Sequence, residues 1–247
     1  MYQPRLRKSR NRIPIMSNAE IDEHVEELLK DYKSTVLKNP QPVDIEAFAE
    51  IYLDLALDYT YLSHCGLILG RMIFQNTERV PVYLPREKCA DYLYVDRGTM
   101  MIDNTVLEDR KEYRLRSTIG HECGHWIFHS DYYTHTNYQS QGIKPQSGIT
   151  ECRKIDIEGG SGTAGKRRLI TDTDWLEHQA KYFSAAILMP KTPFVSVALD
   201  IRVVLAEKSQ EGKTKEIKEL LGKYGAAKLS AVEEKDYLAL LAEAKVL

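Results

Sequence analysis

His121-Glu122-Cys123-Gly124-His125 is the stretch of this sequence that most strongly indicates its fold and chemistry. On a helix, positions four apart lie on one face, so His121 and His125 can reach one metal ion together. Imidazole is a good ligand for Zn²⁺, and Glu122 is placed to act as a general base beside that ion. Gly124 lets another segment approach the helix closely. The alternative is a pair of ordinary core or surface histidines on an amphipathic helix.

The third ligand of such a site is predicted from a second helical segment. A catalytic zinc usually has three protein ligands and one open position, and Glu177 is the best candidate for the third. It flanks an apolar stripe at helical spacing, formed by Leu176, Ala180, Phe183 and Ile187. The small residues Ala180 and Ser184 would let this helix press close to the motif helix. An exposed helix glutamate is the alternative, because glutamate is mostly found at the surface.

Together, the two segments resemble a known family. They read Thr118-Ile-Gly-His-Glu-Cys-Gly-His-Trp-Ile-Phe-His129 and Trp175-Leu-Glu-His-Gln-Ala-Lys-Tyr-Phe-Ser-Ala-Ala-Ile-Leu-Met-Pro190. This pairing is similar to the ImmA/IrrE family of metallopeptidases, in which an H-E-x-x-H helix is followed by a glutamate-bearing helix ending in Leu-Met-Pro. The resemblance covers roughly residues 17–192. The chain departs from the family at Lys181, where Asn is common, and in the long segment between the motifs.

The resemblance implies a function and a fold. His121, His125 and Glu177 would bind one Zn²⁺, and Glu122 would be the general base of an endopeptidase. The fold would be α+β and zincin-like, with a small, mostly antiparallel sheet packed against an active-site helix and supporting helices. The substrate would be a cytoplasmic protein, plausibly a helix-turn-helix repressor of a mobile element or stress operon.

Other residues near the motif are candidates for auxiliary roles. His129 shares a side of the helix with His121 and could polarise a substrate carbonyl, or it could face solvent at the helix end. Tyr132 and Tyr133 are candidates for hydrogen bonds to the transition state, with packing at the rim as the alternative. Cys152 could occupy the open zinc position as a thiolate, or it could be an ordinary reduced thiol.

The hydrophobic pattern predicts three parts of the chain. Residues 1–16 are basic and are expected to be a disordered tail, and translation could instead begin at Met16. Residues 17–192 are predicted to form the metallopeptidase domain, which includes a long loop at residues 130–173. Residues 193–247 are expected to be a C-terminal helical extension. Its last helices are predicted to pack antiparallel, with a helix-turn-helix as the alternative.

Local patterns predict the elements of the middle part. Ser17 and Glu20 fit a capping box for a helix that extends to about Leu37, and Asp44 can cap a second, short helix. Short runs rich in β-branched and aromatic residues predict strands at 59–62, 67–74, 80–84, 92–95 and 100–102. The motif helix is predicted over residues 109–129, and the Glu177 helix over residues 174–189.

Composition excludes several classes of protein. Apolar residues are 43% and charged residues 28%, as in ordinary soluble proteins. No run approaches the roughly 18 apolar residues that a membrane span needs. The formal net charge of -2 argues against a protein-wide nucleic-acid surface. The basic start has no apolar stretch typical of a secretory signal, and the four cysteines form no C-x-x-C pair, so we expect a reducing cytoplasm.

Two other functions stay open at this point. In the first, the protein is a non-catalytic, zinc-containing binding module that regulates a repressor by contact. In the second, it is a nucleic-acid-binding regulator that uses the basic tail and the C-terminal helices, which tight, salt-sensitive DNA binding would support.

Overall fold

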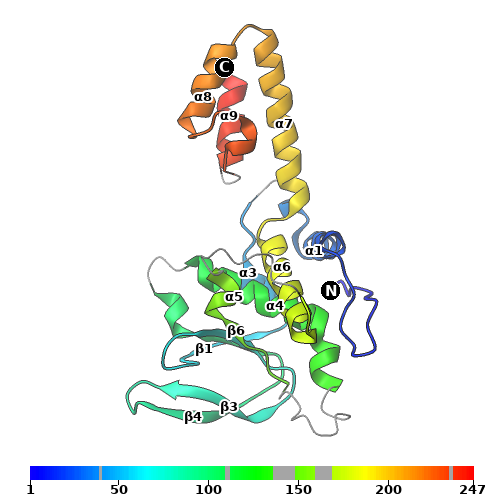
Figure 1. Cartoon of the computed structure of the whole chain (residues 1–247), viewed down its shortest axis with the longest axis vertical. Coiled ribbons are helices and arrows are strands. Elements are labelled where there is room, and N and C mark those ends of the chain that lie inside the picture. The colour runs from blue at the N-terminus through cyan, green and yellow to red at the C-terminus, as the bar shows by residue number, and fades with distance from the viewer. Residues whose placement is uncertain (39–40, 109–111, 136–147, 159–168, 234–235) are drawn as a thin grey trace. The chain divides into compact units, whose positions relative to one another are not determined.

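The structure is a computed structural model that describes residues 1–38, 41–108, 112–135, 148–158, 169–233 and 236–247. These residues form a mixed α/β protein (Figure 1). Contacts between residues divide them into two compact units. Unit 1 comprises Met1–Tyr32 and Val43–Leu188, and unit 2 comprises Lys33–Pro42 and Met189–Leu247. Residues 33–42 therefore belong to unit 2, although the sequence places them in the 17–192 domain.

The elements up to the motif helix are α1 (Asn18–Lys33), α2 (Thr35–Lys38), α3 (Ile45–Ala47), the π-helical turn η1 (Phe48–Tyr52), β1 (Ala56–Thr60), β2 (Ile68–Met72), β3 (Thr77–Leu84), β4 (Cys89–Val95), β5 (Thr99–Asp103) and the 3₁₀ turn η2 (Asn104–Leu107). They are followed by α4 (Glu112–His135), β6 (Cys152–Arg153), α5 (Lys154–Glu158), α6 (Asp172–Leu188), α7 (Lys191–Gln210), α8 (Thr214–Lys223), the 3₁₀ turn η4 (Leu229–Ala231) and α9 (Tyr237–Val246).

The strands form a small mixed sheet and a separate hairpin. The sheet has the order β1-β5-β2-β6, with β1 parallel to β5 and the other pairs antiparallel. Strands β3 and β4 pair only with each other among the described residues. The prediction of one small sheet is therefore wrong for β3 and β4, which form a hairpin outside that sheet. A buried apolar cluster joins the hairpin to the sheet instead, and it contains Val80, Val82 and Val95 of the hairpin with Ile73 and Met101.

The first helix begins where the sequence predicts. Ser17 Oγ accepts a hydrogen bond from the Glu20 amide at 3.3 Å, and Glu20 Oε2 accepts one from the Ser17 amide at 2.8 Å. This reciprocal pair is the predicted capping box. The helix ends at Lys33 rather than near Leu37, and a separate short helix α2 follows. Asp44 also caps as predicted, because its Oδ1 accepts a hydrogen bond from the Ala47 amide.

The motif helix α4 continues six residues beyond its predicted end at His129, to His135. The polar residues that suggested a loop make local hydrogen bonds in the helix instead: Ser130 Oγ donates to the Trp126 carbonyl, and Thr134 Oγ1 donates to the Ser130 carbonyl. Tyr133 is buried against Phe74, with ring centroids 4.7 Å apart. The predicted helix start at residues 109–111 lies outside the described residues.

The long predicted loop at residues 130–173 is only partly described. Residues 136–147 and 159–168 lie outside the described residues. Between them, residues 148–153 run along β2, where the Phe74 amide donates to the Gly148 carbonyl and the Thr150 amide donates to the Met72 carbonyl. A segment with few apolar residues can still add to a sheet, because the pairing uses backbone groups.

Close packing between α4 and α6 is what positions the site. A Cβ added at Gly124 would lie 3.1 Å from Ala180 Cα and 3.1 Å from Phe183 Cβ. A Cβ added at Gly120 would lie 2.8 Å from Ser184 Oγ. Gly120 and Gly124 on α4 thus face Ala180 and Ser184 on α6. The predicted close approach of the two helices, made possible by small residues, is confirmed.

Replacing Gly124 with valine is expected to lower the free energy of unfolding of unit 1 by about 1–3 kcal/mol, because the added methyl groups would push α6 away. The two tryptophans, Trp126 on α4 and Trp175 on α6, report on this unit by fluorescence during chemical denaturation. Gly222→Ala is the control, since its added Cβ would meet no described atom within 4 Å apart from its chain neighbours and the backbone of its own helix. An unchanged tryptophan transition in Gly124→Val would contradict the close packing.

The N-terminal residues differ from the expected disordered tail. Lys8 and Pro14 form an antiparallel bridge, and the Ile15 amide donates to the Arg7 carbonyl at 2.8 Å. Ile13 is buried, with 6% of its surface exposed. The basic composition predicted a disordered tail, but Arg7 and Lys8 are paired with acids of the folded unit, Glu20 and Asp131.

Unit 2 has an apolar core of its own. Its buried members include Val197 and Ile201 on α7, Leu220 and Leu221 on α8, and Leu240, Leu241 and Ala244 on α9. All three helices therefore contribute to one cluster. None of the described helices has the length and apolar character needed to cross a membrane.

Candidate metal centre

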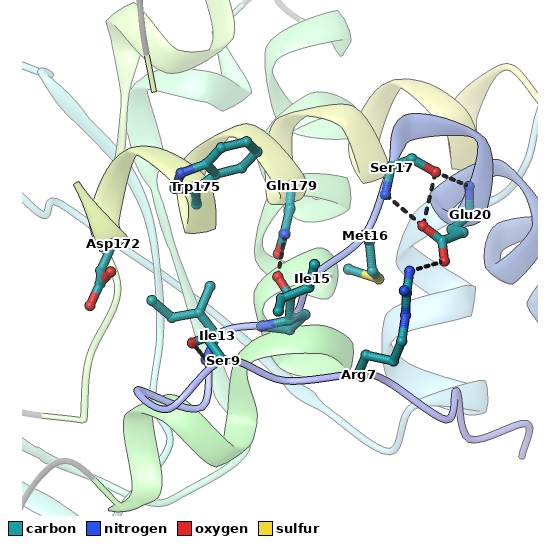
Figure 2. A pocket seen from close by; sticks show the side chains of 11 residues that line it. Arg7, Ser9, Ile13, Ile15, Met16, Ser17, Glu20, Asp172, Trp175 and Gln179 are labelled. Carbon is teal, nitrogen blue, oxygen red and sulfur yellow. Dashed lines mark hydrogen bonds and ion pairs between the residues drawn. The ribbon is translucent and has the colours of Figure 1, made fainter. Parts of the chain in front are cut away.

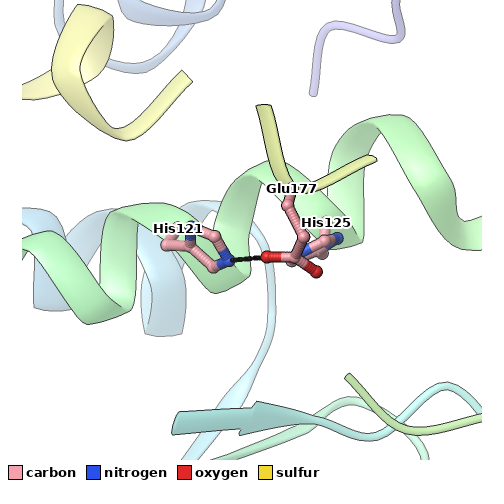
Figure 3. Close-up of side chains that lie close together, drawn as sticks. All are labelled: His121, His125 and Glu177. Atoms are coloured by element: carbon pink, nitrogen blue, oxygen red, sulfur yellow. Dashed lines mark hydrogen bonds and ion pairs between the residues drawn. The ribbon is translucent and has the colours of Figure 1, made fainter. Parts of the chain in front are cut away.

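Two helices bring three potential metal ligands together. His121 and His125 come from α4, and Glu177 comes from α6 (Figure 3). One donor atom from each lies within 4.8 Å of the other two. The helical period aligns the two histidines, and the close approach at Gly124 brings Glu177 alongside them. Among the described residues, this is the only group of three or more His, Cys, Asp and Glu side chains with such spacing.

The spacing of the donor atoms fits a zinc ion. His121 Nε2 and His125 Nε2 are 3.1 Å apart, and Glu177 Oε2 and Oε1 lie 3.2 Å and 3.5 Å from these two atoms respectively. Ligand atoms that are about 2.0–2.1 Å from a tetrahedral zinc lie about 3.3 Å from one another. Two imidazoles and one carboxylate are also a donor set that zinc accepts. The three residues present thus fit a zinc ion in both kind and spacing.

Unsatisfied buried oxygens support the same interpretation. Among the described residues, Glu177 Oε2 and Glu122 Oε1 are buried without a hydrogen-bond partner. Buried polar atoms are nearly always paired, so each such atom calls for an explanation. Glu177 Oε2 lies 3.2 Å from His121 Nε2, so a single cation could accept a lone pair from each of these two atoms. A cation would satisfy Glu177, and a polar molecule beside it would satisfy Glu122.

Glu177 and His121 shift each other's pKa values. Burial alone would raise the pKa of Glu177, but contact with His121 and His125 outweighs burial and lowers that pKa well below its ordinary value. Burial alone would lower the pKa of His121, but the contact and charge of Glu177 raise it. Glu177 is therefore ionised at neutral pH, which is the state in which a carboxylate binds a metal.

Glu122 lies between α4 and strand β2 and is fully buried. A Cβ added at Gly70 of β2 would lie 3.3 Å from Glu122 Oε1, so any larger residue there would crowd the carboxyl group. Burial raises the pKa of Glu122, and the nearby His125 and His121 oppose that shift. A raised pKa is typical of a carboxylate that takes up and releases a proton during catalysis.

Thr150 holds the other oxygen of Glu122. Its Oγ1 donates to Glu122 Oε2 at 2.6 Å and accepts from the Met72 amide at 2.8 Å. The backbone of β2 thereby orients the threonine, and the threonine orients the carboxylate. No local sequence pattern marked Thr150, because it lies in the segment that was expected to be a loop.

The auxiliary candidates lie in different places. Tyr133 is buried, and its ring centroid is 5.9 Å from that of His125. Burial, followed by the charges of Glu177 and Glu122, raises the pKa of Tyr133, so its hydroxyl stays protonated and able to donate. Tyr132 is partly buried and packs edge-on against Tyr133. His129 is neither at the helix end nor exposed, since it is fully buried inside α4.

Cys152 lies on β6, opposite Gly70 of β2, and is fully buried. It is not part of the three-ligand group. Burial, followed by the charge of Glu122, raises the pKa of this thiol well above its ordinary value. The structure therefore favours the interpretation of Cys152 as a reduced, buried thiol.

Comparison with known proteins finds no family model that matches the chain and no curated protein that matches it.

Proposed function

We propose that this protein is a zinc-dependent endopeptidase of the zincin type. The observation that carries the proposal is the convergence of His121, His125 and Glu177 beside the buried, partly unsatisfied carboxylate of Glu122. The motif sequence and the Glu177 helix also resemble the ImmA/IrrE family. Two histidines, a third ligand from another helix and an adjacent acid are the parts that metal-assisted hydrolysis requires.

The roles of the residues follow from their positions. When bound, zinc lowers the pKa of water and polarises a carbonyl group. Glu122 accepts the proton from the attacking water on its free oxygen, Oε1, while Thr150 holds Oε2. Glu122 then passes the proton to the leaving amine. Tyr133, whose ring centroid lies 5.9 Å from that of His125 and whose hydroxyl stays protonated, would donate a hydrogen bond to the developing negative charge.

The substrate class rests on the resemblance alone. It points to a cytoplasmic protein of the class of helix-turn-helix repressors of mobile elements or stress operons.

A direct test combines metal content with the detection of cleavage. The full chain, loaded with zinc, is incubated with purified helix-turn-helix repressors and with a proteome-derived peptide library, and new termini are identified by mass spectrometry. We expect one zinc per chain and new termini that disappear when zinc is removed with a chelator. A chain that binds one zinc but produces no chelator-sensitive termini would contradict the endopeptidase proposal.

Replacing Thr150 with valine is expected to leave zinc content unchanged and to lower kcat/KM by about 10- to 100-fold. Valine has nearly the shape of threonine but cannot donate to Glu122, and a hydrogen bond to a charged group contributes about 1.5–3 kcal/mol. Thr150→Ser, which retains the hydroxyl, should recover most of the activity. Equal activity in Thr150→Val and the wild type would show that the threonine does not orient the base.

One observation favours a second function. His121, Glu122 and His125 are fully buried, and only Glu177 keeps 25% of its side-chain surface exposed. A site with this little exposure also suits a zinc-containing module that regulates a repressor by contact without cleaving it. The Glu122 variant described below distinguishes the two functions.

A further inference from the structure

A chain of buried hydrogen bonds starts at the ligand His125 and leads away from the metal centre. His125 Nδ1 lies 2.9 Å from His129 Nδ1, and His129 Nε2 lies 3.0 Å from Gln179 Oε1. Gln179 Nε2 donates to the Pro14 carbonyl at 2.8 Å. Both histidines are fully buried, and Gln179 is 1% exposed. The chain therefore connects α4, α6 and the N-terminal segment without reaching solvent.

The direction of every bond in this chain follows from its two ends. A backbone carbonyl only accepts, so the amide group of Gln179 donates to Pro14 and its oxygen faces His129. His129 Nε2 must then donate to Gln179 Oε1. At the other end, Nε2 of His125 faces His121 and Glu177, and a histidine that binds a metal keeps a lone pair on the ligating nitrogen. The ring proton of His125 is then on Nδ1, which donates to Nδ1 of His129.

The two ligand histidines differ in whether their Nδ1 atom has a hydrogen-bond partner. Among the described residues, Nδ1 of His121 is buried without a hydrogen-bond partner. His125 is thus the ligand whose ring orientation and tautomer are set by hydrogen bonds. In metal sites, such outer partners typically contribute 10- to 100-fold to affinity.

The far end of the chain is held by residues 7–16, which we call the N-terminal arm. Figure 2 shows the arm beside α6, with Gln179 directed toward it. Asn11 Nδ2 donates to Asp172 Oδ2 at the start of α6, and Lys8 pairs with Asp131 of α4. Ile13 is buried next to Pro14. A pocket of about 550 Å³ lies between the arm and α6, and Pro14 and Gln179 are among its lining residues.

We propose that His129 and Gln179 are positioning residues for the ligand His125, and that the N-terminal arm completes the metal centre through the Pro14 carbonyl. The proposal rests on the proposed zinc site. It assigns a role to a segment that composition alone describes as a tail, and it makes zinc affinity depend on residues that never contact the metal.

The test measures zinc affinity of the full chain by competition with a chromogenic chelator. Gln179→Leu removes both hydrogen bonds of the side chain and is expected to weaken zinc binding about 10- to 100-fold. Gln179→Glu keeps an oxygen facing His129 but cannot donate to the Pro14 carbonyl, so it should weaken zinc binding less than Gln179→Leu does. His178→Ala is the matched control, because the neighbouring residue on α6 contacts Asn18 instead, and it should bind zinc like the wild type.

A second variant and a spectroscopic measurement separate positioning from simple loss of structure. Ile13→Asp, which is expected to detach the arm, should weaken zinc binding as Gln179→Leu does. The ¹⁵N chemical shifts of the His125 ring in the metal-free protein should report a proton on Nδ1 in the wild type. In Gln179→Leu they should report a mixture of tautomers, while the tryptophan unfolding transition stays cooperative.

The outcomes distinguish this proposal from the one it rests on. Zinc bound by the wild type, with equal affinity in Gln179→Leu, would overturn the positioning role and leave the zinc site intact. Equal loss in Gln179→Leu and Gln179→Glu would overturn the contribution of the bond between Gln179 and His129, because the Glu variant can still accept that bond. Unchanged affinity in Ile13→Asp would overturn the role of the arm. A wild type without zinc affinity would overturn both proposals.

Discussion

Replacing Glu177 with alanine is expected to abolish stoichiometric zinc binding. The variant would leave only His121 and His125 as ligands, and the structure places no other His, Cys, Asp or Glu among the described residues in the same group. The loss should exceed the roughly 100-fold upper range for partners that do not touch the metal, since Glu177 supplies both a donor atom and the negative charge. Elemental analysis of the purified protein measures this directly.

The control for this variant is Asp156→Asn. Asp156 is an acid whose charge raises the pKa of His121, but it lies outside the three-ligand group. Asparagine can still accept the hydrogen bond that Asp156 Oδ2 receives from the Arg153 amide. This variant should keep one zinc per chain. If Glu177→Ala also kept one zinc, the proposed third ligand would be wrong, and the donor set would have to be sought elsewhere.

Replacing Glu122 with glutamine is expected to lower the kcat/KM of the peptidase about 10²- to 10⁴-fold while zinc stays bound. General acid–base catalysis contributes a factor of that size. Glutamine has the same shape and can still accept the hydrogen bond from Thr150, so the packing against Gly70 should be retained. It cannot take a proton from water at neutral pH. The measurement pairs kcat/KM on an identified substrate with zinc content of the same preparation.

The same variant decides between the two proposed functions. Tryptophan fluorescence during denaturation provides the folding control, since Trp126 lies on the same helix as Glu122. A Glu122→Gln protein that binds zinc, folds and fails to cleave supports the endopeptidase. A Glu122→Gln protein that retains full biological output, together with a wild type that never cleaves its partner, would favour regulation by contact.

The helices could be predicted well because their patterns are local. Ser17 and Glu20 are three residues apart, and the capping box they form needs no other part of the chain. The prediction for α6 was similarly local, and its apolar stripe of Leu176, Ala180, Phe183 and Ile187 is buried. The end of α4 was missed because Ser130 and Thr134 are typical of loops but bond to carbonyls within the helix.

The sheet was harder, because strand order depends on partners that are distant in sequence. Strand β1 pairs with β5 in parallel, as Tyr59 opposite Ile102 illustrates, and β2 lies on the other side of β5. The residue pattern of each predicted strand contains no information about which other strand it pairs with. The hairpin of β3 and β4 stands apart from the sheet because its apolar residues pack onto the sheet's face rather than extending its edge.

The sequence by itself determined the core of the candidate site. Four-residue spacing on a helix places His121 and His125 on one face, and the small residues at Gly124 and Ala180 permit the approach that brings in Glu177. Only the tertiary structure decided what surrounds these ligands. Thr150 bonds Glu122 across 28 positions, and Gln179 bonds Pro14 across 165. Such contacts arise from packing between distant segments, and no local periodicity encodes them.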